Sequence, residues 1–289
     1  MAWEQAIRFA CQGETLPGVV HHGRADAATG VLVIVGGPQY RVGSHRQFVL
    51  LARDLAARGI PVMRFDARGM GDASGSAADF TALDADIAAA VDAFIEHTPR
   101  LDRVVLWGLC DAASAALFYA WQDPRIAGMV LLNPWARTPA GEARTYLRHY
   151  YTRRLMSRAF WQRLLGGRVA WRTSLAALGA NLRRSADAAP DPGAATDALP
   201  ALSLPERMAA GLERFAGPAL FVLSGNDLTA AEFRDAAARS HRWRRLRARD
   251  NLAWTELAEA DHTFSRRSWR DEVARRTGDW VLALGPAAR

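Results

Sequence analysis

The sequence contains no lysine, so all 37 of its basic residues are arginines. Together with its abundant alanine, this indicates a high-GC codon bias more than selection for a basic surface. The formal net charge of +7 is therefore weak support for a nucleic-acid partner. Zinc-finger, helix-turn-helix and aromatic RNA-binding motifs are also missing, so the sequence does not predict nucleic-acid binding.

Cysteine is nearly as scarce, with only Cys11 and Cys110, and their spacing is not that of metal ligands. No metal or diffusible cofactor is implied. No window reaches the roughly 20 apolar residues that a membrane span needs. The stretch 1–9 lacks a basic segment followed by an apolar core, so no export signal is visible. We expect a cytoplasmic protein without an integral membrane segment, in which a disulfide is disfavoured.

What the chain does contain is a strand, a tight turn and a helix around Cys110. An apolar run, 103–109, precedes this cysteine, and an alanine-rich segment, 111–117, follows it. Gly108 and Ala112 are the small residues two before and two after Cys110, as in a nucleophile elbow, where they let the backbone bend sharply. From this motif alone, a buried structural cysteine is an equally good interpretation.

Apolar runs of strand length alternate with helical patterns along the rest of the chain. This alternation predicts an α/β fold with a doubly wound, mostly parallel sheet. An opening hairpin is expected over 7–20. The expected strands are 30–37, 59–65, 103–109, 125–134, 218–224 and 252–257, and the main expected helices are 45–58, 78–97, 229–240 and 265–284.

Composition changes after residue 135 and predicts an inserted segment. We expect a core over 1–135 and 212–289, with a helical cap and an Ala/Pro-rich linker over 136–211. Between residues 136 and 184 there are eleven arginines and a single acid, Glu142. These arginines can be solvated helix faces, a surface for an acidic substrate such as an acyl-carrier protein, or a contact with anionic lipid.

Three residues that can form a catalytic triad follow separate expected strands, in the order Cys110, Asp227 and His262. Nucleophile, acid and histidine is the chain order of α/β-hydrolases. Asp227 could instead cap the helix after it. His241 is the other histidine considered as a base, but it lies among arginines on an expected solvated face. The pattern resembles the α/β-hydrolase family, which implies that fold.

A second pattern, Asp66-x-Arg68-Gly-x-Gly-x-Ser74, strengthens this resemblance. It lies one strand and one helix before the elbow, as it does in that family. We expect its polar side chains to order loops around the site and assign them no chemistry.

Two backbone N–H groups are expected to stabilise an oxyanion. One belongs to Asp111, directly after Cys110. The other should come from the loop after 30–37, where Pro38 has no N–H. Gln39, or less favourably Tyr40, is then the second donor. Tyr40 and Trp135 are also expected to contact the substrate.

The segments 36–48 and 107–115 closely resemble the exosortase A system-associated hydrolase 1 family. This resemblance implies a bacterial acyl hydrolase or transferase from loci for surface-protein sorting and exopolysaccharide production. We expect a hydrolase that cleaves an ester or thioester through an acyl-cysteine intermediate, acting on a small acyl substrate or an acyl-carrier donor. The alternatives are a cysteine-dependent acyltransferase and a non-catalytic binding protein.

Overall fold

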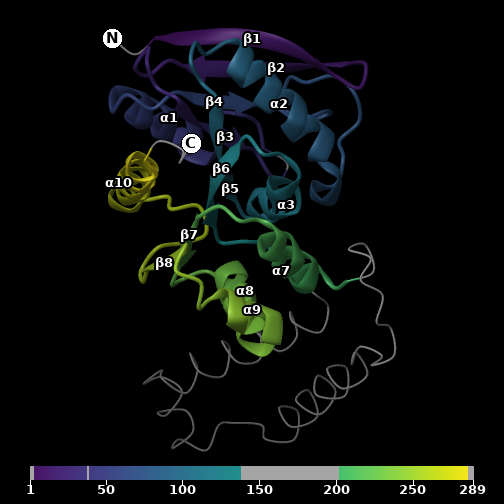
Figure 1. The fold of residues 1–289 in the computed structure, drawn as a ribbon, viewed down its shortest axis with the longest axis vertical. Coiled ribbons are helices and arrows are strands. Elements are labelled where there is room, and N and C mark those ends of the chain that lie inside the picture. Colours follow the sequence, from purple (N-terminus) through teal and green to yellow (C-terminus); the bar gives the residue numbers. More distant parts are fainter. Residues whose placement is uncertain (1–2, 38, 138–201, 286–289) are drawn as a thin grey trace, which may run out of the picture.

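The computed structural model describes residues 3–37, 39–137 and 202–285, and it shows one eight-stranded sheet between two layers of helices (Figure 1). The strand order is β1-β2-β4-β3-β5-β6-β7-β8. β1 pairs antiparallel with β2, and β2 pairs antiparallel with β4, whereas every later pair is parallel. This confirms the predicted doubly wound, mostly parallel sheet.

The central strands are buried along almost their whole length because helices cover both faces of the sheet. The first two strands alternate instead between exposed and buried residues. The strands are β1 (Glu4–Cys11), β2 (Glu14–His21), β3 (Thr29–Ile34), β4 (Val62–Phe65), β5 (Arg103–Leu109), β6 (Ile126–Leu132), β7 (Ala219–Ser224) and β8 (Leu252–Leu257).

Two hydrophobic clusters fill the spaces between the sheet and its helices. On one face lie α1 (Gln47–Ala57) and α10 (Arg267–Ala283). The other face is covered by α2 (Asp84–Glu96), α3 (Asp111–Tyr119), α7 (Leu204–Arg214), α8 (Leu228–Arg239) and α9 (His241–Leu246). Within the described ranges, no helix is long and apolar enough to span a lipid bilayer.

Two helix positions differ from the sequence predictions. α1 begins at Gln47 and not at residue 45, because His45 and Arg46 have positive φ angles of 52° and 61° that no right-handed helix accepts. The short helix α9 was missed. Its arginines obscure two buried residues, Leu246 and Trp243, and the indole N–H of Trp243 donates to the Pro205 carbonyl at 2.8 Å.

The last residues of the predicted cap segment form a helix that packs with the core. α7 begins at Leu204, and its residues Met208 and Leu212 are fully buried in the same cluster as α3. Residues 204–211 therefore belong to the core. The rest of the predicted cap, from residue 138 to residue 201, lies outside the described residues.

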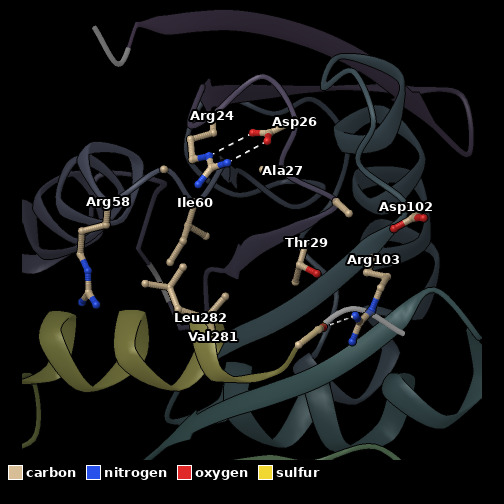
Figure 2. Close-up of a pocket in the computed structure, with 13 residues that line it drawn as sticks. Arg24, Asp26, Ala27, Thr29, Arg58, Ile60, Asp102, Arg103, Val281 and Leu282 are labelled. Atoms are coloured by element: carbon tan, nitrogen blue, oxygen red, sulfur yellow. Dashed lines mark hydrogen bonds and ion pairs between the residues drawn. The ribbon is translucent and has the colours of Figure 1, made fainter. Parts of the chain in front are cut away.

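The two edges of the parallel sheet each carry a cavity. The larger one, about 620 Å³, lies at the amino ends of β3 and β5 beside the end of α10 (Figure 2). Its three arginines already have partners: Arg24 binds Asp26, Arg58 binds Asp279, and Arg103 donates to the Gly285 carbonyl at 2.7 Å. The smaller cavity, about 400 Å³, lies at the carboxyl edge.

Candidate active site

Cys110 occupies a sharp turn between β5 and α3, as the elbow motif predicts. Its backbone angles, φ 64° and ψ −123°, are rare for any residue with a side chain, and such strain gathers at functional sites. Gly108 makes this turn possible. A Cβ atom there would lie 2.6 Å from the Ala112 carbonyl, so a larger residue would push α3 away from the strand. The sulfur consequently follows a buried strand and precedes the positive end of a nine-residue helix.

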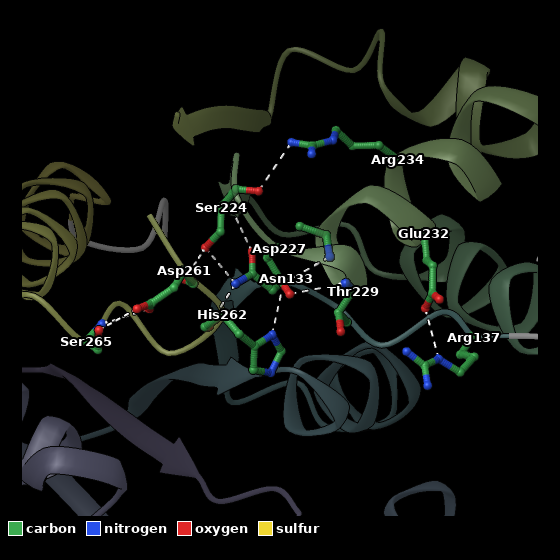
Figure 3. Close-up of polar contacts among 11 residues, drawn as sticks. Asn133, Arg137, Ser224, Asp227, Thr229, Glu232, Arg234, Asp261, His262 and Ser265 are labelled. Carbon is green, nitrogen blue, oxygen red and sulfur yellow. Dashed lines mark hydrogen bonds and ion pairs between the residues drawn. The ribbon is translucent and has the colours of Figure 1, made fainter. Parts of the chain in front are cut away.

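Asp227 follows β7 and makes both of the contacts that the sequence suggested. Its Oδ2 atom lies 2.9 Å from Nδ1 of His262 (Figure 3). The same carboxylate caps α8 by accepting from the N–H groups of Thr229 at 3.2 Å and Ala230 at 3.1 Å. Because the cap bonds fix the carboxylate on the helix, the helix itself orients the acid toward the imidazole.

His262 lies between the acid and the cysteine. Its hydrogen bond to Asp227, and then its hydrogen bond to Cys110, raise its pKa from the usual 6.5 to about 10, against the opposing effect of burial. The imidazole therefore carries a proton at neutral pH. The structure thus brings together the three residues predicted from separate strands, with His262 hydrogen-bonded to Asp227 and lining the same cavity as Cys110.

The cavity at the carboxyl edge of the sheet adjoins Cys110 and His262. Cys110, Asp111, Gln39 and His262 line it, and the apolar side chains around them include Trp135. Trp135 is tied to the elbow, since its N–H donates to the Cys110 carbonyl at 3.1 Å. The full lining is Gly36, Gly37, Gln39, Phe48, Phe80, Leu109, Cys110, Asp111, Trp135 and His262.

Two residues considered from the sequence are not in this lining. Tyr40 is 46% exposed, and its Cβ atom packs beside Gly71. The structure therefore does not bring it to the cavity as a substrate contact. His241 is exposed at the first residue of α9. Of His241 and His262, only His262 lines the cavity together with Cys110.

The loop after β3 differs from the expected oxyanion hole. The N–H of Gln39 donates to the Gly37 carbonyl at 2.8 Å, so it closes a local turn and is not free for a substrate oxygen. The N–H of Gly37 donates to the Asp111 carboxylate at 2.7 Å. Among the described residues, the Asp111 N–H in the first turn of α3 remains the predicted donor with the best placement.

The Asp111 side chain was not expected in the site. Its carboxylate lies against Gly36, where a Cβ atom would come within 1.9 Å of Oδ1, and it also accepts from the Ala112 N–H at 2.9 Å. Burial raises the pKa of this carboxyl group despite these bonds. The Gly37 N–H, close to the nucleophile, is thus already hydrogen-bonded to the Asp111 carboxylate. No sequence motif predicts this contact.

The motif beginning at Asp66 holds neighbouring loops in place by hydrogen bonds, as the sequence predicts. Asp66 is fully buried and accepts from the Arg41 N–H at 2.6 Å and the Asp72 N–H at 3.0 Å. Arg68 forms a forked pair with the buried Asp86 on α2. These bonds anchor the segment that continues from Gln39.

Sequence reasoning also missed a buried polar group behind His262. Asn133, Ser224 and the backbone of Asp261 and His262 are joined by hydrogen bonds (Figure 3). An Asn-Pro dipeptide such as 133–134 favours a turn, but it does not reveal a side chain that bonds to a segment 129 residues away. In the part of the chain that the structure describes, no group of three or more His, Cys, Asp or Glu side chains could hold a metal ion.

Comparisons with solved structures agree with this fold. An esterase of Pyrococcus furiosus has a TM-score of 0.65 at 12% identity, covering 98% of this chain and 92% of that chain. Est1E from Butyrivibrio proteoclasticus, solved with ferulic acid, has a TM-score of 0.62 at 15% identity, covering 96% and 99%. A dienelactone hydrolase from Anabaena variabilis has a TM-score of 0.59 at 14% identity, covering 98% of each. At these identities the likeness shows the fold.

No curated protein matches the chain. The family model described as serine aminopeptidase, S33, matches residues 26–234. The matched range contains Cys110 and Asp227 and ends before His262. The family description names a serine, whereas the elbow residue of this chain is a cysteine. Since the model covers well over half of the sequence, the chain belongs to this α/β-hydrolase family.

Proposed function

We propose that this α/β-hydrolase cleaves a carboxylic ester or thioester through an acyl-cysteine intermediate on Cys110. The observation that supports this most directly is the position of His262, which is hydrogen-bonded to Asp227 at 2.9 Å and lines the same cavity as Cys110. Each member of this triad lies at the carboxyl end of its own strand. That arrangement supplies a nucleophile and a proton carrier in one cavity, with an orienting acid bonded to the histidine.

The first half of the reaction transfers the acyl group to sulfur. The Cys110 thiolate attacks the carbonyl carbon, a carbon–sulfur bond forms, and the carbonyl electron pair moves to oxygen. The Asp111 N–H and the amino end of α3 stabilise that oxyanion. When the oxyanion collapses, the bond to the alkoxide or thiolate leaving group breaks, and the His262 imidazolium gives that group its proton.

The second half regenerates the enzyme. Neutral His262 takes a proton from water as the water oxygen attacks the acyl carbon. The tetrahedral intermediate then collapses, the carbon–sulfur bond breaks, and the carboxylic acid leaves the Cys110 thiolate beside the imidazolium. Asp227 keeps the imidazole in one tautomer throughout, because its carboxylate accepts from Nδ1.

The cavity favours an apolar acyl group of moderate size. Phe48, Phe80, Leu109 and Trp135 surround the nucleophile in a volume of about 400 Å³. Pockets of that size accept small ligands. The resemblance of segments 36–48 and 107–115 to the exosortase-associated hydrolases supports a bacterial, cytoplasmic setting, with a small acyl substrate or an acyl-carrier donor.

A graded series of p-nitrophenyl esters and acyl-thioesters tests the proposal. We expect saturable hydrolysis by the wild-type chain and an intact mass raised by one acyl group when His262→Ala is incubated with substrate. Proteolytic mapping should place that group on Cys110. Cys11→Ala is the matched control and should hydrolyse normally, because Cys11 is buried at the end of β1.

The same assay separates hydrolysis from transfer. If added alcohols, amines or thiols leave product formation unchanged, the enzyme is a hydrolase. If they capture most of the acyl group in place of water, the chain is an acyltransferase. An acyl group on any residue other than Cys110, or full activity in Cys110→Ala, would contradict the proposed intermediate.

A further inference from the structure

We propose that Asn133, together with Ser224, is a positioning residue that holds the backbone of His262 and so aims its imidazole at Cys110. This inference rests on the proposed function, because it assigns Asn133 a task in that triad. Asn133 follows β6, Ser224 ends β7, and His262 lies on the loop after β8 (Figure 3). Three strand ends are thereby joined behind the catalytic histidine.

Asn133 uses its whole amide group in this contact. Its Oδ1 atom accepts from the Ser224 N–H at 2.8 Å, and its Nδ2 group donates to the Ser224 Oγ at 2.9 Å and to the His262 carbonyl at 3.0 Å. The backbone N–H of Ser224 can only donate, so it fixes which end of the amide is oxygen. The residue is fully buried and has a φ angle of 43°, a conformation that asparagine tolerates better than most residues.

Ser224 completes the arrangement. Its hydroxyl group accepts from Asn133 and donates to the Asp261 carbonyl at 2.8 Å. Two successive carbonyls, those of Asp261 and His262, are therefore bonded to fully buried side chains. On the other side of the loop, the Asp261 carboxylate accepts from the Ser265 N–H at 2.9 Å. The backbone on either side of the imidazole has little freedom to rotate.

The sheet alone does not supply this restraint. β8 is the last strand in the sheet order, so the loop after it has a neighbouring strand on one side only. Asp227 holds the ring at Nδ1, and Asn133 holds the backbone of the same residue. With both contacts the imidazole has a defined direction. Without the second, the His262 carbonyl loses a buried donor and the ring can swing on the Asp227 bond.

Two variants that leave the charge of the protein unchanged test the inference. Asn133→Gly removes the amide and tolerates the positive φ angle, and Ser224→Ala makes a smaller change if the glycine variant folds poorly. Thr277→Val is the matched control, because Thr277 is fully buried on α10 and accepts a hydrogen bond from Trp107 at 3.4 Å. All three variants lose a buried hydrogen bond, but only the first two lie behind His262.

The measurements are kcat, KM and the NMR titration of the His262 imidazole. We expect kcat to fall ~100-fold in Asn133→Gly and ~10-fold in Ser224→Ala, with KM within ~3-fold of wild type, because a small misplacement of a catalytic group acts on the chemical step. The imidazole should titrate at least ~1 pH unit lower than in wild type in both variants. Thr277→Val should lower Tm without either change.

NMR titration needs no turnover, so it tests the positioning role even in a chain that hydrolyses nothing. If wild type is inactive but the imidazole titration still shifts in Asn133→Gly and Ser224→Ala, the proposed function fails and the positioning role stands. If both variants lower Tm but keep the wild-type titration and kcat, Asn133 only stabilises the fold, and the inference is overturned.

Discussion

The amino and carboxyl edges of the sheet each have a cavity, and the larger cavity is not the one that holds the candidate active site. The amino edge has the larger cavity, about 620 Å³, but its arginines are bound to Asp26, Asp279 and the Gly285 carbonyl. The carboxyl edge has about 400 Å³, and there a strained cysteine meets a histidine held by an acid. Loops that leave parallel strands converge at the carboxyl edge, so side chains distant in sequence meet there.

The largest effect should come from removing the nucleophile. Cys110→Ala is expected to lower kcat by ~10⁴-fold or more, because the covalent step cannot occur without the sulfur. Burst and steady-state kinetics with the preferred p-nitrophenyl ester measure this. Cys11→Ala in the same assay should remain at the wild-type rate. A Cys110→Ala variant that retains a tenth of wild-type activity would remove the distinction between the two edges.

Loss of the acid should come next. Asp227→Asn is expected to lower kcat by ~10³-fold, since the amide can hold the imidazole in the wrong tautomer and cannot stabilise its charge. The α8 cap should largely survive, because asparagine caps helices as well as aspartate does. A Tm within a few degrees of wild type together with a very different kcat would show that the ion pair, and not the cap, carries the effect on the reaction. A parallel loss of Tm and kcat would argue against that separation.

Stability should depend on pH through His262. The folded-state pKa of about 10 lies above the usual 6.5, so this stabilisation is complete below about pH 6.5 and is lost as the pH rises through about 10. The imidazole is 35% exposed, so we expect a screened effect of about 1 kcal/mol. The Tm of wild type should exceed that of His262→Gln by ~2–4 °C near pH 6 and converge with it near pH 10.5. A gap that widens with pH would have the wrong sign.

Asp111 offers a smaller effect at the same edge. Its carboxylate accepts from the Gly37 N–H and adds negative charge beside the expected oxyanion. Asp111→Asn keeps an acceptor for that N–H but removes the charge, so kcat should rise about fivefold, which corresponds to about 1 kcal/mol of repulsion. The rate of the acylation burst measures this directly. A fall in kcat would show that the charge itself has a catalytic task.

The smallest effect is expected at the amino edge. Arg103→Ala opens the larger cavity and removes the bond to the Gly285 carbonyl, but it touches no member of the triad. We expect kcat/KM to stay within ~2-fold of wild type and Tm to fall slightly. A large loss of kcat/KM at constant Tm would mean that the larger cavity takes part in the reaction.

Much of the carboxyl edge could be predicted because its residues follow strands with strong apolar patterns. The run 103–109, the small residues around Cys110 and the strand 252–257 each carry a local signal, and parallel topology brings their ends together. The two contacts of Asp227 were also visible as two alternatives, and the structure shows both in a single carboxylate.

The contacts that could not be predicted join residues with no local pattern in common. Asn133 reaches His262 only because β6, β7 and β8 are neighbours, and Asp111 meets Gly37 only because β3 lies beside β5. The local turn that engages the Gln39 N–H likewise depends on backbone geometry and not on residue type. Helix α9 was hidden because charged residues surround its one buried tryptophan.

The most direct test of the central claim is the rate at which each of the two cysteines reacts with iodoacetamide, measured by peptide mapping. We expect Cys110 to react faster than a model thiol such as glutathione at neutral pH, and Cys11 to react slowly, since burial limits access and raises its pKa. His262→Ala should slow Cys110 by ~100-fold or more and leave Cys11 unchanged. Labelling of Cys110 at the rate of a model thiol, unaffected by His262→Ala, would contradict the account.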